Sequence, residues 1–519
     1  MVRRLLKSLL KESAYPEPTE NVSLIETHVS FIFLTDQFVY KVKKPVNFGF
    51  LDFTTLERRH FFCQEEVRLN RRLCPDIYLG VVELHETEAG ASFRAGGRLI
   101  DYAVKMKRLP KERMLDHLLV SGTVEAATMA SLARFVADFH AKAARGPEID
   151  ACGSLPAIRE NWAENFRQAE PFVGQTIRAC DLALIRCSVE QFLSGHGELF
   201  GERVRDGFIR ECDGDLHPGN ICLTDGICIF DCIEFNERFR YTDVCADVAF
   251  LLMDLEFSGH RELCRPFLEA YRQAGGDPGP SSLVNFYQGY RAFIRGKVHS
   301  FRLQEAGVPP EELARAKETA ERYFRLARGC ALRDRLSPTL ILTCGAMGSG
   351  KSTLARELAF QLGLPLAQSD AVRKKLAGPA ATRGSEQAYD QGIYAPSFNQ
   401  ATYDQLLKKA AAALRSGSGM VVDATFRRRG DRDRFQRLAR EAGAGFAVLE
   451  TACPPQLIKE RLEKRGKDPH ELSDGRWELF PRQLAEFEPT AAGESVHIDS
   501  ALPLPEEVDQ ALRGMGILP

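Results

Sequence analysis

The chain has 519 residues, of which 44% are hydrophobic and 27% are charged, and its formal net charge is −2. This length exceeds what one hydrophobic core fills, so we expect two large domains. The balanced charge gives no global basic excess of the kind that binds nucleic acid through its phosphates. No apolar stretch approaches the roughly 20 residues that a membrane-spanning helix needs, so no membrane partner is expected. The oligomeric state does not follow from composition.

The 14 cysteines are scattered, and many lie inside apolar runs such as residues 221–223 and 227–229. A free thiol in such a run behaves as a small hydrophobe. No C-x-x-C pair occurs, and the basic N-terminal stretch is interpreted as an amphipathic helix rather than a signal peptide. The sequence therefore predicts reduced thiols in a cytoplasmic protein, without disulfides or a zinc site.

Residues 30–43 form two β-rich runs around a Thr-Asp-Gln turn and predict a hairpin. Lys41 lies in the second run, where a kinase-type strand lysine would reach the α- and β-phosphates of a nucleotide; the alternative is a solvated edge charge. The helical pattern of residues 56–73 follows and carries Glu65 and Glu66. We expect Glu66 to pair with Lys41, whereas a solvent-facing acid is the ordinary alternative.

Residues 98–109 predict another strand, which runs into a hinge at Met106. The helical pattern of residues 132–140 then begins an α-rich region. The order of these elements predicts a small β-rich lobe followed by a larger helical lobe.

The strongest pattern of the first half is the segment 213–220, DGDLHPGN. Asp215 and Asn220 keep the D-x-x-x-x-N interval of a kinase catalytic loop, in which the aspartate accepts the proton of a hydroxyl and the asparagine binds Mg²⁺. Asp231 follows the next apolar run, where a second metal carboxylate is expected. A turn rich in Asp, Pro, Gly and Asn is the alternative, but the second carboxylate in register disfavours it.

These residues make the region of about 20–330 resemble the aminoglycoside phosphotransferase family, the small-molecule branch of the protein-kinase-like fold. The resemblance implies a bilobal domain that uses ATP or GTP with Mg²⁺. It implies a catalytic aspartate at Asp215, metal ligands at Asn220 and Asp231, and a nucleotide-binding pair at Lys41 and Glu66. The sequence departs from the family at residue 213, where aspartate replaces the usual histidine, and this affects the packing under the catalytic loop. Asp247 matches the family's following helix and is interpreted as a structural support of that loop.

Residues 248–328 are helical in pattern throughout. Arg291, Arg295 and Lys297 either line a pocket for an acidic substrate or form a solvated helix face. The polar segment 334–338 predicts a short linker, so we place one domain at 1–335 and another at 336–519.

The second domain opens with the apolar run 340–344 and the motif G-x-x-x-x-G-K-S, followed by a helical pattern. This order predicts the strand, loop and helix of a phosphate-binding P-loop. Lys351 would reach the β- and γ-phosphates, and the Ser352 hydroxyl would ligate Mg²⁺. The remaining expected nucleotide-binding residues of the loop are Gly345, Gly348, Ser349, Gly350 and Thr353.

Beyond the P-loop, Asp370 follows a short strand and is predicted to deprotonate an acceptor hydroxyl; the alternative is a simple helix N-cap. Asp423 ends a buried strand at the position of a Walker-B-like carboxylate that orders Mg²⁺. Arg432 is a candidate acceptor contact. Arg461 and Arg465 lie four residues apart on a helix and suit a catalytic lid, or else a surface row with interleaved glutamates.

Residues 338–500 resemble the P-loop small-kinase group that includes gluconate kinase, chloramphenicol phosphotransferase, zeta toxins and phage polynucleotide kinase. The resemblance implies a three-layer α/β/α domain with a parallel sheet, an aspartate base at Asp370 and lid arginines at Arg461 and Arg465. The fold class expected for the whole chain is therefore α+β in the first domain and α/β in the second.

Both halves resemble phosphotransferases on unrelated folds, and the whole chain resembles bacterial fusions of these two domains. We therefore expect transfer of a nucleotide's γ-phosphoryl group to a hydroxyl acceptor, either a small molecule or a nucleoside or nucleic-acid end. One alternative has a single catalytic domain and a nucleotide-binding regulator. Another is a P-loop ATPase with a kinase-like binding module. No motif identifies the acceptor, because acceptor pockets are built from residues that no motif fixes.

Overall fold

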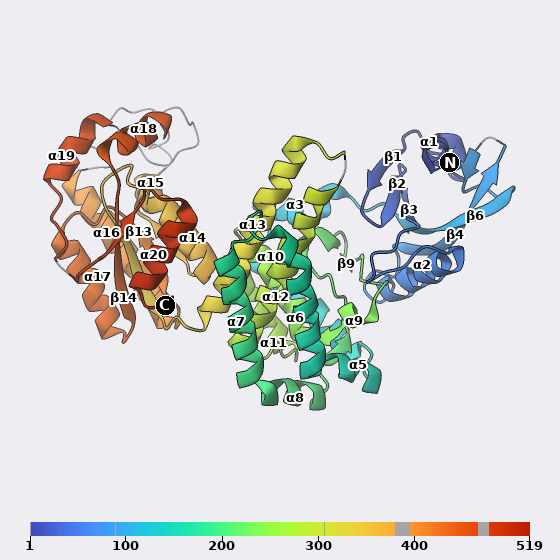
Figure 1. Ribbon diagram of the computed structural model, residues 1–519, viewed down its shortest axis with the longest axis horizontal. Helices are drawn as coiled ribbons and strands as arrows, with labels where there is room; N and C mark the ends of the chain where they lie inside the picture. The colour runs from blue at the N-terminus through green and yellow to red at the C-terminus, as the bar shows by residue number, and fades with distance from the viewer. Residues whose placement is uncertain are drawn as a thin grey trace. The chain divides into compact units, whose positions relative to one another are not determined.

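The computed structural model describes residues 2–88, 90–305, 307–378, 395–465, 477–491 and 493–518. The chain forms two compact units, Met1–Phe324 and Arg325–Pro519 (Figure 1). The division lies inside helix α13 (Pro310–Arg333), upstream of the segment 334–338 where the sequence predicts a linker. No described helix has both the length and the apolar character that a membrane crossing requires.

The first unit begins with a six-stranded antiparallel sheet in the order β1-β2-β3-β6-β4-β5. Its strands are β1 (Ser23–Glu26), β2 (Ser30–Leu34), β3 (Phe38–Lys43), β4 (Tyr78–Thr87), β5 (Gly90–Ser92) and β6 (Arg98–Lys107). Strands β2 and β3 pair with Leu34 opposite Val39, so the predicted hairpin is confirmed. Helix α1 (Val2–Leu9) contacts β5.

The strand predicted to run into a hinge at Met106 is present as β6, and the hinge itself stays a prediction. Met106 pairs with Val39 of β3 and with Tyr78 of β4, and β6 ends one residue later, at Lys107. The Met106 side chain packs on the apolar cluster beneath the sheet, so the chain keeps its strand conformation there.

Helix α2 (Leu56–Asn70) lies against one face of this sheet (Figure 1). Thr55 caps it, because its hydroxyl oxygen accepts a hydrogen bond from the Arg58 backbone N–H at 3.3 Å. Cys63 and Val67 pack with Val104 of β6 in a shared apolar cluster. The face of α2 that carries these residues also turns Glu66 inward, toward the sheet.

The rest of the first unit is mainly helical, which confirms the predicted α-rich region. Its longer helices are α4 (Ala126–Lys142), α6 (Leu155–Ala169), α7 (Ala179–Gly195), α10 (Val244–Phe257), α11 (Cys264–Gln273) and α12 (Ser281–Phe301). Helix α10 packs on α12, and α4 packs on α11. Two short antiparallel pairs interrupt the helices: β7 (Ile209–Glu211) with β10 (Tyr241–Asp243), and β8 (Ile221–Leu223) with β9 (Ile227–Ile229).

The expectation that every cysteine is a free thiol is wrong for one pair. Cys74, just after α2, forms a disulfide with Cys228 of β9, with 4.9 Å between their Cα atoms. Both residues are buried in the apolar cluster that also contains Cys63 and Val104. The two cysteines are 154 residues apart, and no local sequence pattern marks such a contact.

The second unit contains a five-stranded parallel sheet in the order β12-β13-β11-β14-β15. Its strands are β11 (Thr339–Cys344), β12 (Leu366–Gln368), β13 (Met420–Asp423), β14 (Gly445–Ala452) and β15 (Val496–Asp499). Its helices include α14 (Lys351–Leu362), α15 (Ser369–Ala377), α16 (Pro396–Arg415), α17 (Arg429–Glu441), α18 (Pro455–Arg465), α19 (Phe480–Ala485) and α20 (Leu504–Gly514). This arrangement confirms the predicted α/β domain with a parallel sheet.

Helices cover the sheet of the second unit on both sides (Figure 1). Helices α16 and α17 pack on one face, against a cluster that contains Leu340, Leu342 and Val422. Helices α14 and α20 contact the strands and each other. The end of α13 joins this unit, because Arg328 donates to the Asp509 carboxylate of α20 at 2.5 Å.

Candidate active sites

Three chain segments bring Lys41, Glu66 and Asp231 together in the first unit. The Lys41 ammonium group lies 2.9 Å from Oε1 of Glu66 and 2.5 Å from Oδ1 of Asp231. Glu66 is fully buried and the Lys41 side chain is 10% exposed, whereas the Asp231 side chain is 46% exposed. Glu65 instead pairs with Arg68 at the surface of α2, which agrees with the prediction that Glu66 is the partner of Lys41.

Neighbouring charges strongly shift the pKa values of Lys41 and Glu66. Burial raises the pKa of Glu66, but Lys41 and Lys43 outweigh burial and lower this pKa to about 2. Burial also lowers the pKa of Lys41, but Asp231 and Glu66 outweigh it and hold this pKa well above its ordinary value. Lys41 therefore keeps a positive charge beside a partly exposed carboxylate, as a phosphate-binding lysine requires.

The D-x-x-x-x-N segment forms a compact loop in the first unit. The Asn220 side-chain amide donates to the Asp215 carboxylate at 3.1 Å and to the Asp215 backbone oxygen at 3.2 Å. The backbone oxygen of Asn220 accepts a hydrogen bond from the N–H of Phe230. The pairing of β8 with β9 thus places Asn220 next to the residue that precedes Asp231.

The neighbours of Asp215 favour its ionised form. Burial raises its pKa, but His217 and, more weakly, Arg295 and Arg291 lower it below the ordinary value. Nε2 of His217 lies 3.5 Å from the Asp215 carboxylate, whose side chain is 33% exposed. An ionised and accessible carboxylate can accept the proton of a hydroxyl group.

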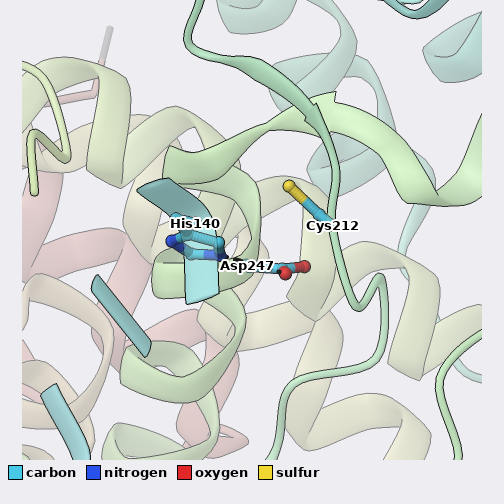
Figure 2. A group of neighbouring side chains, drawn as sticks. All are labelled: His140, Cys212 and Asp247. Carbon is cyan, nitrogen blue, oxygen red and sulfur yellow. Dashed lines mark hydrogen bonds and ion pairs between the residues drawn. The ribbon is translucent and has the colours of Figure 1, made fainter. Parts of the chain in front are cut away.

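Asp247 supports this loop from below, as predicted. Its two carboxylate oxygens accept hydrogen bonds from the backbone N–H groups of Asp213 and Gly214, at 2.8 and 2.9 Å. Figure 2 shows Asp247 beside His140, whose Nε2 lies 3.4 Å from the carboxylate. Ligand atoms of His140, Asp247 and Cys212 lie within 4.8 Å of one another.

The chemistry of this buried group indicates a structural support and not a metal centre. Nδ1 of His140 is hydrogen-bonded to the Tyr271 hydroxyl at 2.8 Å, and the Cys212 thiol donates to a backbone oxygen. Burial raises the pKa of Cys212 well above its ordinary value, so the metal-binding thiolate is disfavoured. The Asp247 oxygens are already used by backbone N–H groups.

Asp213, which stands where the resembled family has histidine, is buried at 1% exposure. One of its carboxyl oxygens accepts from the Asp215 backbone N–H at 3.1 Å, and the other has no hydrogen-bond partner. Burial, with Asp247 and Asp215 nearby, raises its pKa well above the ordinary value. The surroundings of Asp213 therefore favour a protonated carboxyl group under the loop.

Two of the three cations that the sequence assigns to an acidic-substrate pocket or a solvated face have other contacts. Arg291 is buried and donates to the backbone oxygens of Gly214 and Ala246, so it holds the loop. Lys297 is buried and donates to the side-chain oxygens of Asn165 and Gln168. Arg291 and Lys297 therefore neither line a substrate pocket nor form a solvated helix face. Protein carbonyl and amide oxygens take the place of water around their charged groups.

The P-loop of the second unit runs from β11 into α14. Gly345 has a φ of +136°, and a Cβ atom there would lie 2.6 Å from the Thr451 backbone oxygen. Gly350 has a φ of +91° directly before Lys351, the first residue of α14. Glycine adopts such positive φ values without strain and has no Cβ atom to clash with Thr451. The backbone N–H groups can therefore turn inward, as a phosphate cradle requires.

The polar side chains of the loop are fixed by short contacts. The Ser349 hydroxyl lies 2.7 Å from the Thr451 hydroxyl of β14. The Lys351 ammonium group donates to the Ala346 backbone oxygen at 2.6 Å, which arches this side chain over the loop. Ser352 is half-buried, whereas Thr353 is exposed; the predicted nucleotide-binding role of both remains a prediction.

The two predicted carboxylates of this unit lie at the carboxyl ends of neighbouring parallel strands. Asp423, at the end of β13, accepts from the Thr343 hydroxyl of β11 and from the Gln368 amide of β12, both at 3.1 Å. Asp370 follows Gln368 by two residues, in the first turn of α15, and pairs with Arg373 at 2.7 Å. This edge of an open α/β sheet is where ligands bind.

Arg461 of α18 reaches the P-loop. It donates to the Ser500 hydroxyl at 3.2 Å and to the Ser500 backbone oxygen at 2.5 Å. A Cβ atom at Gly350 would lie 3.4 Å from the Arg461 guanidinium group, which places this cation beside the loop. Arg465 ends α18, and its side chain lies outside the described residues.

The expectation that Arg432 contacts an acceptor is wrong. Its side chain is 1% exposed, and its donors bind the backbone oxygens of Phe426, Glu488 and Pro489 and the Glu494 carboxylate. Arg432 therefore holds the segment after β13, where Phe426 has an unusual φ of +44°.

Sequence reasoning missed four side chains around the first site. Lys43 binds Glu66 and Glu234, the Tyr78 hydroxyl accepts from the Asp231 backbone N–H, and the Asn70 amide oxygen accepts from the Cys232 N–H. The only local signal was for Lys43, which follows Lys41 by two residues and so shares its strand face.

Both sites have oxygen donors that suit Mg²⁺. In the first unit, Asn220 uses its amide nitrogen on Asp215, which leaves its amide oxygen and the exposed Asp231 carboxylate for a cation. In the second unit, Ser352 and Asp423 provide a hydroxyl and a carboxylate near the P-loop. Bound Mg²⁺ would neutralise charge on the nucleotide phosphates.

Known proteins are similar to parts of this chain. Residues 340–490 match the AAA domain family. Solved structures similar to part of the chain include a gluconokinase from Sinorhizobium meliloti 1021 (24% identical, TM-score 0.27, 35% of this chain and 94% of that chain) and a sugar kinase from Janibacter sp. HTCC2649 (21% identical, TM-score 0.27, 35% and 95%).

Curated relatives match most of the chain. The uncharacterized proteins Rv2004c of Mycobacterium tuberculosis (strain H37Rv) and Mb2027c of Mycobacterium bovis are each 31% identical to it over 445 residues. The match covers 86% of this chain and 86% of each relative. The chain therefore belongs to the family of these mycobacterial proteins, and it carries a C-terminal P-loop domain that matches the AAA domain family.

Proposed function

We propose that this protein is a two-domain, ATP- or GTP-dependent phosphotransferase with one active site in each unit, and that each site moves a γ-phosphoryl group to a hydroxyl acceptor. The observation that carries the proposal is the meeting of Lys41, Glu66 and Asp231, which come from β3, α2 and the segment after β9. A buried lysine–glutamate pair next to an exposed metal-type carboxylate is the arrangement that kinases use to orient a nucleotide.

In the first site, Lys41 would bind the α- and β-phosphates, and Asn220 and Asp231 would hold Mg²⁺. Asp215 accepts the proton of the acceptor hydroxyl. Its pKa lies below the ordinary value, so it is ionised and ready at neutral pH. The resemblance to the aminoglycoside phosphotransferase family supports these roles residue by residue, and Asp247 and Arg291 hold the loop in place.

In the second site, the P-loop would bind the β- and γ-phosphates through its backbone and Lys351, and Ser352 and Asp423 would hold Mg²⁺. Asp370 acts as the base, and Arg461 stabilises charge on the transferring phosphoryl group. The match of residues 340–490 to the AAA domain family and the resemblance to P-loop small kinases support this assignment.

The test is phosphate-transfer profiling of the full chain against a panel of metabolites, nucleosides and aminoglycosides, with three variants. Asp215→Asn is expected to remove transfer to one class of acceptor, lowering its rate by about 10² to 10⁴. Lys351→Ala is expected to remove transfer to a different class, and the double variant is expected to lose both.

The two rival hypotheses give other patterns. If Asp215→Asn leaves every transfer rate unchanged, the first unit is a binding module or regulator and the two-site proposal fails. If Lys351→Ala removes ATP hydrolysis but no acceptor becomes phosphorylated by the wild-type second site, that unit is an ATPase and not a kinase.

A further inference from the structure

The buried charges next to Lys41 extend further than a single lysine–glutamate pair. The Lys43 ammonium group lies 2.6 Å from Oε2 of Glu66 and also forms an ion pair with Glu234. Lys41 holds the other oxygen of the same glutamate, at 2.9 Å. The five charged groups therefore form one chain, in the order Asp231, Lys41, Glu66, Lys43, Glu234.

The two ends of this chain differ in exposure. At one end, Asp231 is 46% exposed and Lys41 is 10% exposed, so a ligand can reach them. At the other end, Lys43 is 0% exposed and Glu234 is 6% exposed, and the Phe53 ring lies 5.0 Å from the Lys43 ammonium group. Of these two lysines, only Lys41 is exposed enough to contact a phosphate, so Lys43 must have another role.

We propose that Lys43 and Glu234 are a positioning pair of the first site: Lys43 fixes Glu66 from the side opposite Lys41, so that Lys41 stays oriented toward the nucleotide. The inference rests on the proposed function of this site. It adds two residues from outside the Lys41–Glu66 pair and assigns them a role in nucleotide affinity.

The physical reason is that Glu66 is shared. A carboxylate held at both oxygens cannot rotate away from Lys41 without breaking a buried ion pair. Lys43 also neutralises Glu234, a buried carboxylate that otherwise attracts Lys41 inward. Without Lys43, Lys41 would face Glu66, Glu234 and Asp231 as the single cation of the group, and its attraction to phosphate would weaken.

Lys43 further ties three elements to one another. It belongs to β3, Glu66 belongs to α2, and Glu234 follows Asp231 by three residues in the segment after β9. The segment that carries the metal-type carboxylate is thus anchored to the strand that carries the phosphate-type lysine. Because Lys43 links β3, α2 and the segment after β9, its role is to position these elements and not merely to neutralise a buried charge.

The experiment measures the affinity of a non-hydrolysable ATP analogue with Mg²⁺ by calorimetry, in the full chain carrying Lys351→Ala. Lys43→Met is expected to raise the Kd at least tenfold. Lys44→Met is the matched control: Lys44 is the next residue, pairs with the 61% exposed Glu26, and is expected to leave the Kd unchanged. Lys41→Met reports the proposed function itself and is expected to abolish binding at this site.

A second variant protects the test against misfolding. Lys43→Met/Glu234→Gln removes the buried carboxylate that Lys43→Met leaves unpaired, so its Tm is expected to return toward that of the parent. The positioning role requires that its Kd stay raised, because Glu66 still lacks its second anchor. Return of both Tm and Kd to parent values would show that Lys43 only neutralises Glu234, and a normal Kd in folded Lys43→Met would overturn the inference directly.

The outcomes for the two proposals are distinguishable. If Lys41→Met binds the analogue as tightly as its Lys351→Ala parent, the proposed nucleotide site fails, and the positioning role fails with it. If Lys41→Met loses binding and Lys43→Met does not, the site stands and only the positioning role is wrong.

Discussion

Asp213 is a buried carboxyl group next to the proposed base Asp215, and its protonation depends on folding. Burial and the nearby Asp247 and Asp215 carboxylates raise its pKa well above the ordinary value, and Arg72 offsets this only in part. The folded protein thus holds a proton there over a pH range in which the unfolded chain has lost it. Stability is therefore expected to fall as the pH rises through this range.

Asp213→Asn is expected to raise the Tm at pH 8 and to raise it less at pH 4, which is close to the ordinary aspartate pKa, so that the unfolded chain also binds part of the proton. The asparagine oxygen can still accept from the Asp215 N–H, so the loop keeps its hydrogen bond. Thermal melts across pH 4–9 measure the effect, with the exposed Asp225→Asn as control. An equal Tm shift at both pH values would mean that Asp213 does not carry the proton.

At the scale of elements, the Cys74–Cys228 disulfide joins the end of α2 to β9. Helix α2 carries Glu66, and β9 leads into Asp231, so the bridge lies beside two of the three segments that build the first site. Asn70 of α2 and Tyr78 of β4 add hydrogen bonds to the segment after β9. The disulfide and the two hydrogen bonds therefore all anchor β9 and the segment that follows it.

Removing this disulfide is expected to destabilise the first unit by about 3 to 5 kcal/mol, because it closes a loop of 154 residues in the unfolded chain. Denaturant unfolding of Cys74→Ser/Cys228→Ser, compared with the oxidised parent, measures the change. Cys180→Ser, at an exposed free cysteine, is the control. Equal midpoints for parent and double variant would contradict the expectation.

Helix α18 brings Arg461 beside Gly350 of the P-loop. Its guanidinium group donates to Ser500, the residue after β15. In the full chain carrying Asp215→Asn, Arg461→Met is expected to lower transfer by the second unit about 10²- to 10³-fold. Arg461→Lys is expected to recover part of the rate, since it keeps the charge but loses the planar fork. Lys464→Met, at an exposed position of the same helix, should have no effect, and a loss there equal to that of Arg461→Met would count against a specific role.

The whole molecule divides into two compact units, each with its own core and its own proposed nucleotide site. We expect scanning calorimetry to resolve two transitions. A non-hydrolysable ATP analogue with Mg²⁺ should raise both, because a ligand that binds only the folded state stabilises it. Lys351→Ala should cancel the shift of the second unit alone, and Lys41→Met that of the first. Cancellation of both shifts by either variant would contradict independent sites.

Much of both sites could be predicted from local sequence. The P-loop and the D-x-x-x-x-N loop are short segments whose backbone shape depends on neighbouring residues, so the structure places Gly345 to Lys351 and Asp215 to Asn220 in compact loops as expected. The hairpin that carries Lys41 and the parallel sheet of the second unit also follow from local patterns of apolar residues.

The contacts between distant segments could not be predicted, and only the tertiary structure decided them. Lys43 and Glu234 are 191 residues apart, and Cys74 and Cys228 are 154 residues apart. Arg291 and Arg432 resemble exposed helix cations in sequence, yet both are buried on backbone oxygens. The physical reason is that the charge of a side chain and its place on a helix or strand are local properties. Its burial and its partners depend on which other element packs over it.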